Sequence, residues 1–114
     1  MPLLRIQTNL AIGPEQRPAM LRQASAAVAE VLGKPERYVM VTLEHNPDML
    51  FAGDDAPLAY LELKSIGLPG ERTRDISARL CGLIEETLDI PKDRVYIEFA
   101  DAARHLWGWN GGTF

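Results

Sequence analysis

The sequence predicts an α/β domain of the two-layer α+β kind, in which two β-α-β repeats form a four-stranded mixed sheet with two helices on one face. The 114 residues suffice for one modest domain. A helical pattern flanked by strand patterns occurs twice, and equivalent apolar positions such as Ala24 and Leu80 are 56 residues apart. We therefore expect a single domain over 1–114, with a pseudo-repeat at 1–56 and 57–104 and a C-terminal tail at 105–114.

The first repeat opens with a strand over residues 2–8, in which Leu4 and Ile6 alternate with polar neighbours. A helix then begins at about Pro18, because proline is tolerated in a first turn, where its missing N–H would be unpaired anyway. It ends at Gly33, and a second strand covers residues 38–44. The apolar stripe of the helix consists of Met20, Leu21, Ala24, Val28, Val31 and Leu32.

The second repeat follows the same plan, with a strand over 59–64, a turn at 67–70, a helix, and a strand over 95–99. The apolar stripe of this helix consists of Ile76, Leu80, Leu83, Ile84 and Leu88. A short right-handed crossover makes its two flanking strands parallel, so each repeat should contribute a parallel pair. Both helices must bury their stripes, and we expect them to cover the same face of the sheet.

The opposite face of the sheet is predicted to be mixed in character. It would carry Met40, Thr42, Glu44, Tyr60, Glu62, Tyr96 and Glu98. These residues are too polar for a core and too aromatic for a face left wholly to water, so this face is expected to meet another copy of the chain. The tail holds both tryptophans, Trp107 and Trp109, and we expect it to dock against a neighbouring subunit. The alternative is a strand that folds back on its own sheet edge.

Composition excludes several classes of function. A net charge of −4 argues against nucleic-acid and anionic-membrane partners. The apolar runs are too short for a membrane span and the N-terminus lacks the plan of a signal peptide, so we expect a cytoplasmic protein. The single Cys81 cannot form an intrachain disulfide and is expected to be buried on a helix. His45 and His105 match no zinc-binding spacing, and no metal is expected.

The N-terminus offers a candidate base. A small second residue allows Met1 to be removed, which would leave Pro2 with a free secondary amine. An apolar pocket would disfavour the protonated form of such an amine and keep it basic near neutral pH. The same amine could instead attack a carbonyl and form an iminium, so a covalent role stays open. Lys34, judged from its local sequence, is interpreted as a cation near the C-terminal end of the first helix.

Six motifs are spread in order over the whole chain. They are Met1-Pro2-Leu3, Gly33-Lys34-Pro35 with Tyr38, Lys64-Ser65-Ile66-Gly67, Leu80-Cys81-Gly82-Leu83, Asp93-Arg94-Val95-Tyr96-Ile97, and Gly108-Trp109-Asn110 with Thr113-Phe114. Together they resemble the macrophage migration inhibitory factor and D-dopachrome tautomerase family. The run at 106–111 is similar to that of the bacterial, cyanobacterial-type members.

The resemblance implies a cofactor-free homotrimer with three active sites at subunit boundaries. It implies keto–enol tautomerisation of phenylpyruvate-like or dopachrome-like compounds, with Pro2 as the catalytic base. Lys34, Ser65 and Ile66 would hold the substrate, and Tyr96 would come from the adjacent subunit. The matching positions of the aromatic pocket are Tyr38, Trp107, Trp109 and Phe114. The alternative function is a cytokine-like module that binds a receptor or host protein, which would require non-classical secretion.

Two departures from the animal members bear on function. Glu98 stands at a substrate-contacting position where those proteins have asparagine, and a carboxylate there would repel an α-keto acid unless it is protonated or turned away. The animal CxxC motif is also absent, since its region reads Pro57-Leu58-Ala59-Tyr60. A thiol–disulfide activity is therefore not expected.

Overall fold

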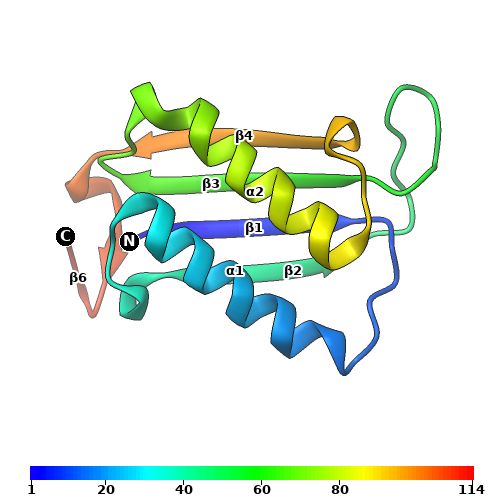
Figure 1. Cartoon of the computed structure of the whole chain (residues 1–114). Coiled ribbons are helices and arrows are strands. Elements are labelled where there is room, and N and C mark those ends of the chain that lie inside the picture. Colours follow the sequence, from blue (N-terminus) through cyan, green and yellow to red (C-terminus); the bar gives the residue numbers. More distant parts are fainter.

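The computed structural model describes residues 1–114 as two layers, a four-stranded sheet and two helices that cover one of its faces (Figure 1). The strand order is β2-β1-β3-β4, so the first strands of the two repeats lie at the centre of the sheet. The elements are β1 (Leu3–Thr8), α1 (Gln16–Leu32), β2 (Met40–His45), β3 (Ala59–Ile66), α2 (Thr73–Leu88) and β4 (Val95–Ala102). The predicted fold class is confirmed.

Strand pairing follows the repeat. Within the first half β1 runs parallel to β2, and within the second half β3 runs parallel to β4, as the crossover rule predicted. The halves join where β1 runs antiparallel to β3, with Ile6 opposite Leu61. Since β1 starts at Leu3, the N-terminus is held at one end of the sheet rather than left as a free tail.

The core lies between the sheet and the helices. Leu4 and Ile6 of β1 are fully buried, as are Leu61 and Leu63 of β3, and the stripes of α1 and α2 pack over them. Cys81 is buried on α2, which confirms the sequence expectation. Neither helix has the length and apolar character needed to cross a membrane.

Several element boundaries differ from the predictions. The helix α1 begins at Gln16 rather than Pro18, which leaves the proline in the first turn, where no backbone N–H is needed. The second strand begins at Met40 rather than Tyr38, because residues 36–38 close a 3₁₀ turn in which the Tyr38 N–H donates to the Pro35 carbonyl. Strands β3 and β4 extend to Ile66 and Ala102, since these residues still pair.

The tail forms a small hairpin, which differs from the single strand that the sequence had suggested. Its strands are β5 (Gly108–Trp109) and β6 (Gly112–Thr113). Asn110 and Gly111 at the turn both have positive φ, at 52° and 78°, as a two-residue hairpin turn with this dipeptide requires. The hairpin lies near the N-terminus, at the same end of the molecule (Figure 1).

Candidate active site

A pocket opens beside the N-terminus, where the start of β1, the turn before β2 and the C-terminal hairpin meet. Its volume is about 390 Å³. Pro2 is fully buried at its edge, and its carbonyl accepts a hydrogen bond from the Met40 N–H at 3.0 Å. The residues that line it are Met1, Pro2, Leu3, Arg37, Tyr38, Val39, Met40, Trp107, Gly108, Trp109 and Phe114.

Three rings form the aromatic wall of this pocket. The ring of Tyr38 meets Trp109 and Phe114 edge-on, each with ring centroids 5.7 Å apart. Trp109 and Phe114 stack on each other at 5.2 Å. These offset and edge-to-face arrangements are the ones that aromatic quadrupoles favour. The hairpin thus holds its aromatic residues over the N-terminus of its own chain, and Trp107 lies half-buried beside them.

The electrostatics at the N-terminus favour a neutral amine. The terminal nitrogen of Met1 donates to the Tyr38 carbonyl at 3.1 Å. Partial burial, together with the positive charge of Lys34, lowers the pKa of this amine below its usual value of 8.0. While Met1 is attached, the Pro2 nitrogen belongs to a peptide bond and is no base. Removal of Met1 would place a secondary amine one residue deeper in the same surroundings.

Lys34, Ser65 and Ile66 come together beside this terminus. The Lys34 ammonium and the Ser65 hydroxyl both donate to the Ile66 carbonyl, each at 3.2 Å. The Lys34 ammonium therefore binds a carbonyl of β3, while its position just after α1 still fits the cation near the helix C-terminus that the local sequence indicated. Lys34 is half-buried, and the three residues lie outside the pocket lining while Met1 is present.

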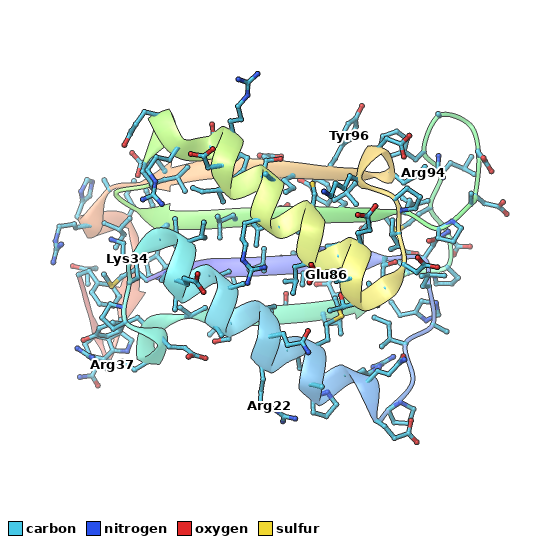
Figure 2. All side chains as sticks on the ribbon, viewed as in Figure 1. Arg22, Lys34, Arg37, Glu86, Arg94 and Tyr96 are labelled. Carbon is cyan, nitrogen blue, oxygen red and sulfur yellow. The ribbon has the colours of Figure 1, made fainter.

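Sequence reasoning missed Arg37, the one charged side chain among the residues that line the pocket. Its guanidinium lies 4.7 Å from the centroid of the Tyr38 ring, within the range of a cation–π interaction. The available signal was its position directly before Tyr38, which the resemblance had placed in the pocket. Figure 2 shows Lys34 and Arg37 at the same end of the molecule.

Tyr96 and Glu98 do not join these residues. Tyr96 lies at the start of β4, at the end of the sheet opposite Arg37 (Figure 2), and is 67% exposed. Its ring tilts over Phe51 with centroids 4.6 Å apart. A second pocket of about 250 Å³ lies there and is lined by hydrophobic residues, Phe51, Leu58, Tyr60 and Tyr96 among them. Within one chain, Tyr96 therefore cannot serve the Pro2 pocket.

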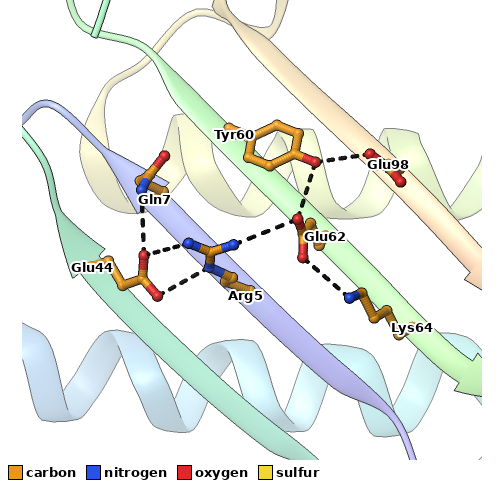
Figure 3. Close-up of polar contacts among 7 residues, drawn as sticks. All are labelled: Arg5, Gln7, Glu44, Tyr60, Glu62, Lys64 and Glu98. Atoms are coloured by element: carbon orange, nitrogen blue, oxygen red, sulfur yellow. Dashed lines mark hydrogen bonds and ion pairs between the residues drawn. The ribbon is translucent and has the colours of Figure 1, made fainter. Parts of the chain in front are cut away.

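The helix-free face of the sheet carries a polar network (Figure 3). Arg5 binds both carboxylate oxygens of Glu44 at 3.0 Å and approaches Glu62 at 3.5 Å. The Tyr60 hydroxyl lies 2.9 Å from a Glu98 oxygen and 3.2 Å from a Glu62 oxygen. These hydrogen bonds, that to Glu98 first, raise the pKa of Tyr60 to about 12. The predicted polar face is present, although the sequence did not single out Arg5 as its centre.

No group of three or more histidine, cysteine, aspartate or glutamate side chains is arranged so that it could hold a metal ion.

Fold and pocket together define a β-α-β repeat domain in which Pro2 lies at the edge of an aromatic pocket. The family model described as "Macrophage migration inhibitory factor (MIF)" matches residues 1–114. The chain belongs to this family, as the resemblance in its sequence indicated.

Individual relatives agree over their full length. The chain is 40% identical to a macrophage migration inhibitory factor homolog from Brugia malayi, with 100% of this chain and 99% of the relative covered. It is 38% identical to macrophage migration inhibitory factor from Mus musculus, with the same coverage. The crystal structure of a homologue from Prochlorococcus marinus superposes with a TM-score of 0.92 at 46% identity, covering 98% of both chains. Family membership supports an isomerase of the tautomerase class in general terms.

Proposed function

We propose that this protein is a keto–enol tautomerase of phenylpyruvate-like α-keto acids or dopachrome-like compounds, with Pro2 as the base once Met1 is removed. The observation that carries the proposal is a fully buried Pro2, at the edge of an aromatic pocket, next to a terminal amine whose pKa is lowered by burial and by Lys34. An aryl side chain fits such a lining, and a neutral amine beside it suits proton abstraction.

The reaction needs only proton transfers. The Pro2 amine takes a proton from the carbon next to the carbonyl, the C–H electrons form the C=C bond, and negative charge develops on the oxygen. Lys34 stabilises that charge or orients the carboxylate, and the protonated Pro2 then returns the proton to oxygen. The iminium alternative predicts a covalent adduct, which borohydride reduction followed by intact mass measurement would trap.

A homotrimer would complete the site. Tyr96 is largely exposed and lies at the far end of its own sheet, so it can reach a Pro2 pocket only in another copy. Glu98, which would repel an α-keto acid, is hydrogen-bonded to Tyr60 on the polar face of the sheet. That contact supports a Glu98 carboxylate turned away from the substrate. Sedimentation or light scattering would test the trimer directly.

The decisive experiment compares phenylpyruvate enolisation by the native protein and by a Pro2→Gly variant, after intact mass has shown that both have lost Met1. General-base catalysis typically contributes a factor of about 10²–10⁴, so the variant should lose activity on that scale. Equal rates in both proteins would end the proposal for Pro2. Native protein that retains Met1 should be inactive, because its Pro2 nitrogen is an amide.

A second candidate function is a cytokine-like binding module in which tautomerase activity is vestigial. The exposed Leu106 and Trp109 of the tail, at 74% and 53% exposure, favour a surface that contacts another protein. This reading gains if Met1 is removed but no keto–enol substrate is turned over.

A further inference from the structure

We propose that Arg37 is a specificity-determining residue, which selects enolisable keto acids that carry a second anionic group at the end remote from the reacting carbonyl. The inference rests on the proposed function and adds a substrate class to it. It begins from the lining of the Pro2 pocket, in which ten of eleven residues carry no side-chain charge and Arg37 supplies the single cationic side chain.

The Arg37 side chain is available for a ligand. It is exposed, and it makes no ion pair and no side-chain hydrogen bond with the rest of the chain. Its only defined contact is with the face of Tyr38, 4.7 Å from the ring centroid. Stacking on an aromatic ring leaves the N–H donors at the edge of the guanidinium free, and their planar fork matches a carboxylate.

The other cation of this region is already engaged at a different place. Lys34 donates to the Ile66 carbonyl and its charge acts on the terminal amine, close to the site of proton transfer. Arg37 instead stands with Tyr38 on the aromatic wall. A ligand whose keto acid lies beside Pro2 and Lys34 would run along this wall toward Arg37. None of the side chains that line the pocket is acidic. The one anionic group among the lining residues is the terminal carboxylate of Phe114, and Arg104 Nε donates to a Phe114 oxygen at 3.0 Å.

The test compares two substrates that differ only in the remote charge, phenylpyruvate and 4-carboxyphenylpyruvate. For each protein the measured quantity is the ratio of kcat/KM for the dianion to kcat/KM for phenylpyruvate. Arg37→Gln should lower this ratio about three- to tenfold, mainly through KM, as expected for the loss of one partly solvated, charge-assisted hydrogen bond. Arg37→Lys should recover part of it. Arg22→Gln is the matched control, because Arg22 is exposed on α1 outside the pocket and its loss changes net charge equally.

Binding measured without turnover separates this inference from the proposed function. Trp107 and Trp109 line the pocket, so quenching of their fluorescence reports ligand binding directly. Tighter binding of 4-carboxyphenylpyruvate in the native protein, weakened by Arg37→Gln and not by Arg22→Gln, supports the role of Arg37 even if no tautomerisation occurs. If Arg37→Gln and Arg22→Gln behave alike in both assays while phenylpyruvate is turned over, the inference is wrong and the tautomerase proposal stands.

Discussion

The two turns that follow the helices have the same backbone and different uses. The helices end at Leu32 and Leu88, the next residues, Gly33 and Asp89, are both left-handed, and 3₁₀ turns follow at 36–38 and 92–94. In the first turn the residue after the left-handed position is Lys34, half-buried beside the N-terminus. In the second turn the equivalent residue is Ile90, which is fully buried.

The last residues of the two 3₁₀ turns also serve different parts of the molecule, Tyr38 the pocket and Arg94 a loop. Tyr38 presents its ring to the pocket, whereas Arg94 binds the backbone carbonyls of the loop before β3. The four carbonyls that accept from Arg94 are those of Phe51, Asp54, Ala56 and Pro57, at 2.7 to 3.4 Å. The same turn conformation therefore supports a pocket in the first half of the chain and anchors a loop in the second. The side chains of each turn, rather than its backbone, determine its role.

The largest effect on stability is expected from giving Ile90 the side chain of its counterpart in the first turn, Lys34. Ile90→Lys would place an ammonium at a fully buried position, and should cost about 4–5 kcal/mol of unfolding free energy. Urea denaturation would measure it. Ile90→Val, which only removes a methylene, should cost about 0.5–1.5 kcal/mol. A lysine variant as stable as the valine variant would mean that the second turn could accommodate a site as well as the first.

Removing the loop anchor should have the next largest effect. Arg94→Met deletes the guanidinium that holds four carbonyls and also lies 5.1 Å from the Phe51 ring centroid. We expect the free energy of unfolding to fall by about 2–3 kcal/mol, because the variant loses all the hydrogen bonds that the charged guanidinium donates to these carbonyls. Amide hydrogen exchange should rise in residues 46–57 before it rises in the core.

Arg74→Met serves as the control for the anchor, since Arg74 is exposed on α2 and should change stability by less than about 0.5 kcal/mol. Uniform loss of protection over the whole chain in Arg94→Met would contradict a local anchoring role.

Lys34→Met should lower activity and change its pH dependence. Burial first and the charge of Lys34 second lower the pKa of the Met1 amine. We expect the same charge to act in the same direction on the Pro2 amine once Met1 is removed, so its loss should raise the pKa of that amine. An amine with a higher pKa stays protonated to a higher pH, and the acid limb of the kcat/KM profile should move upward. At neutral pH we expect a loss of about tenfold in kcat/KM with phenylpyruvate, from the lost charge-assisted contact.

Lys34→Arg keeps the positive charge and should leave the acid limb close to that of the native protein. An unmoved limb in Lys34→Met would show that desolvation alone sets the basicity of the N-terminus.

Much of the fold could be predicted because its signals are local and repeated. Alternation at Leu4 and Ile6 and the helical stripes each identify one buried face, and the constant spacing relates the two halves. The predicted element boundaries are wrong where strand pairing or turn closure determines where an element begins or ends. Ser65 and Ile66 belong to β3 because they still pair with β4. Contrary to the prediction, Tyr38 is not part of β2, because its N–H donates to the Pro35 carbonyl and closes a 3₁₀ turn. The tail hairpin did have a local signal, the Asn110-Gly111 dipeptide, which was overlooked.

The site was less predictable from the residues alone. Pro2 was singled out for its amine, but the pocket around it depends on a hairpin more than 100 residues away in the chain. The local sequence around Lys34 could not indicate its hydrogen-bond partner, because the Ile66 carbonyl lies on a strand of the other half. The resemblance supplied these long-range relations. It did not name Arg37, although the residue lies directly before Tyr38, which the resemblance had placed in the pocket.

The smallest predicted effect tests whether the two turns share one conformational requirement. Gly33 has φ of 63° and Asp89 has φ of 56°, and only glycine adopts this region without a steric cost. A Cβ on Gly33 would meet nothing within 4 Å, so Gly33→Asp carries only the backbone cost and the repulsion between a carboxylate and the helix C-terminus. We expect Gly33→Asp to lower the free energy of unfolding by about 1 kcal/mol. The Asp89 side chain makes no hydrogen bond, so Asp89→Gly should raise the free energy of unfolding by about as much. Asp89→Asn separates the two causes, because it removes the charge and keeps a side chain at positive φ. If denaturant unfolding shows Asp89→Gly to be no more stable than Asp89→Asn, the electrostatic contribution dominates, and the backbone strain at the second turn is negligible.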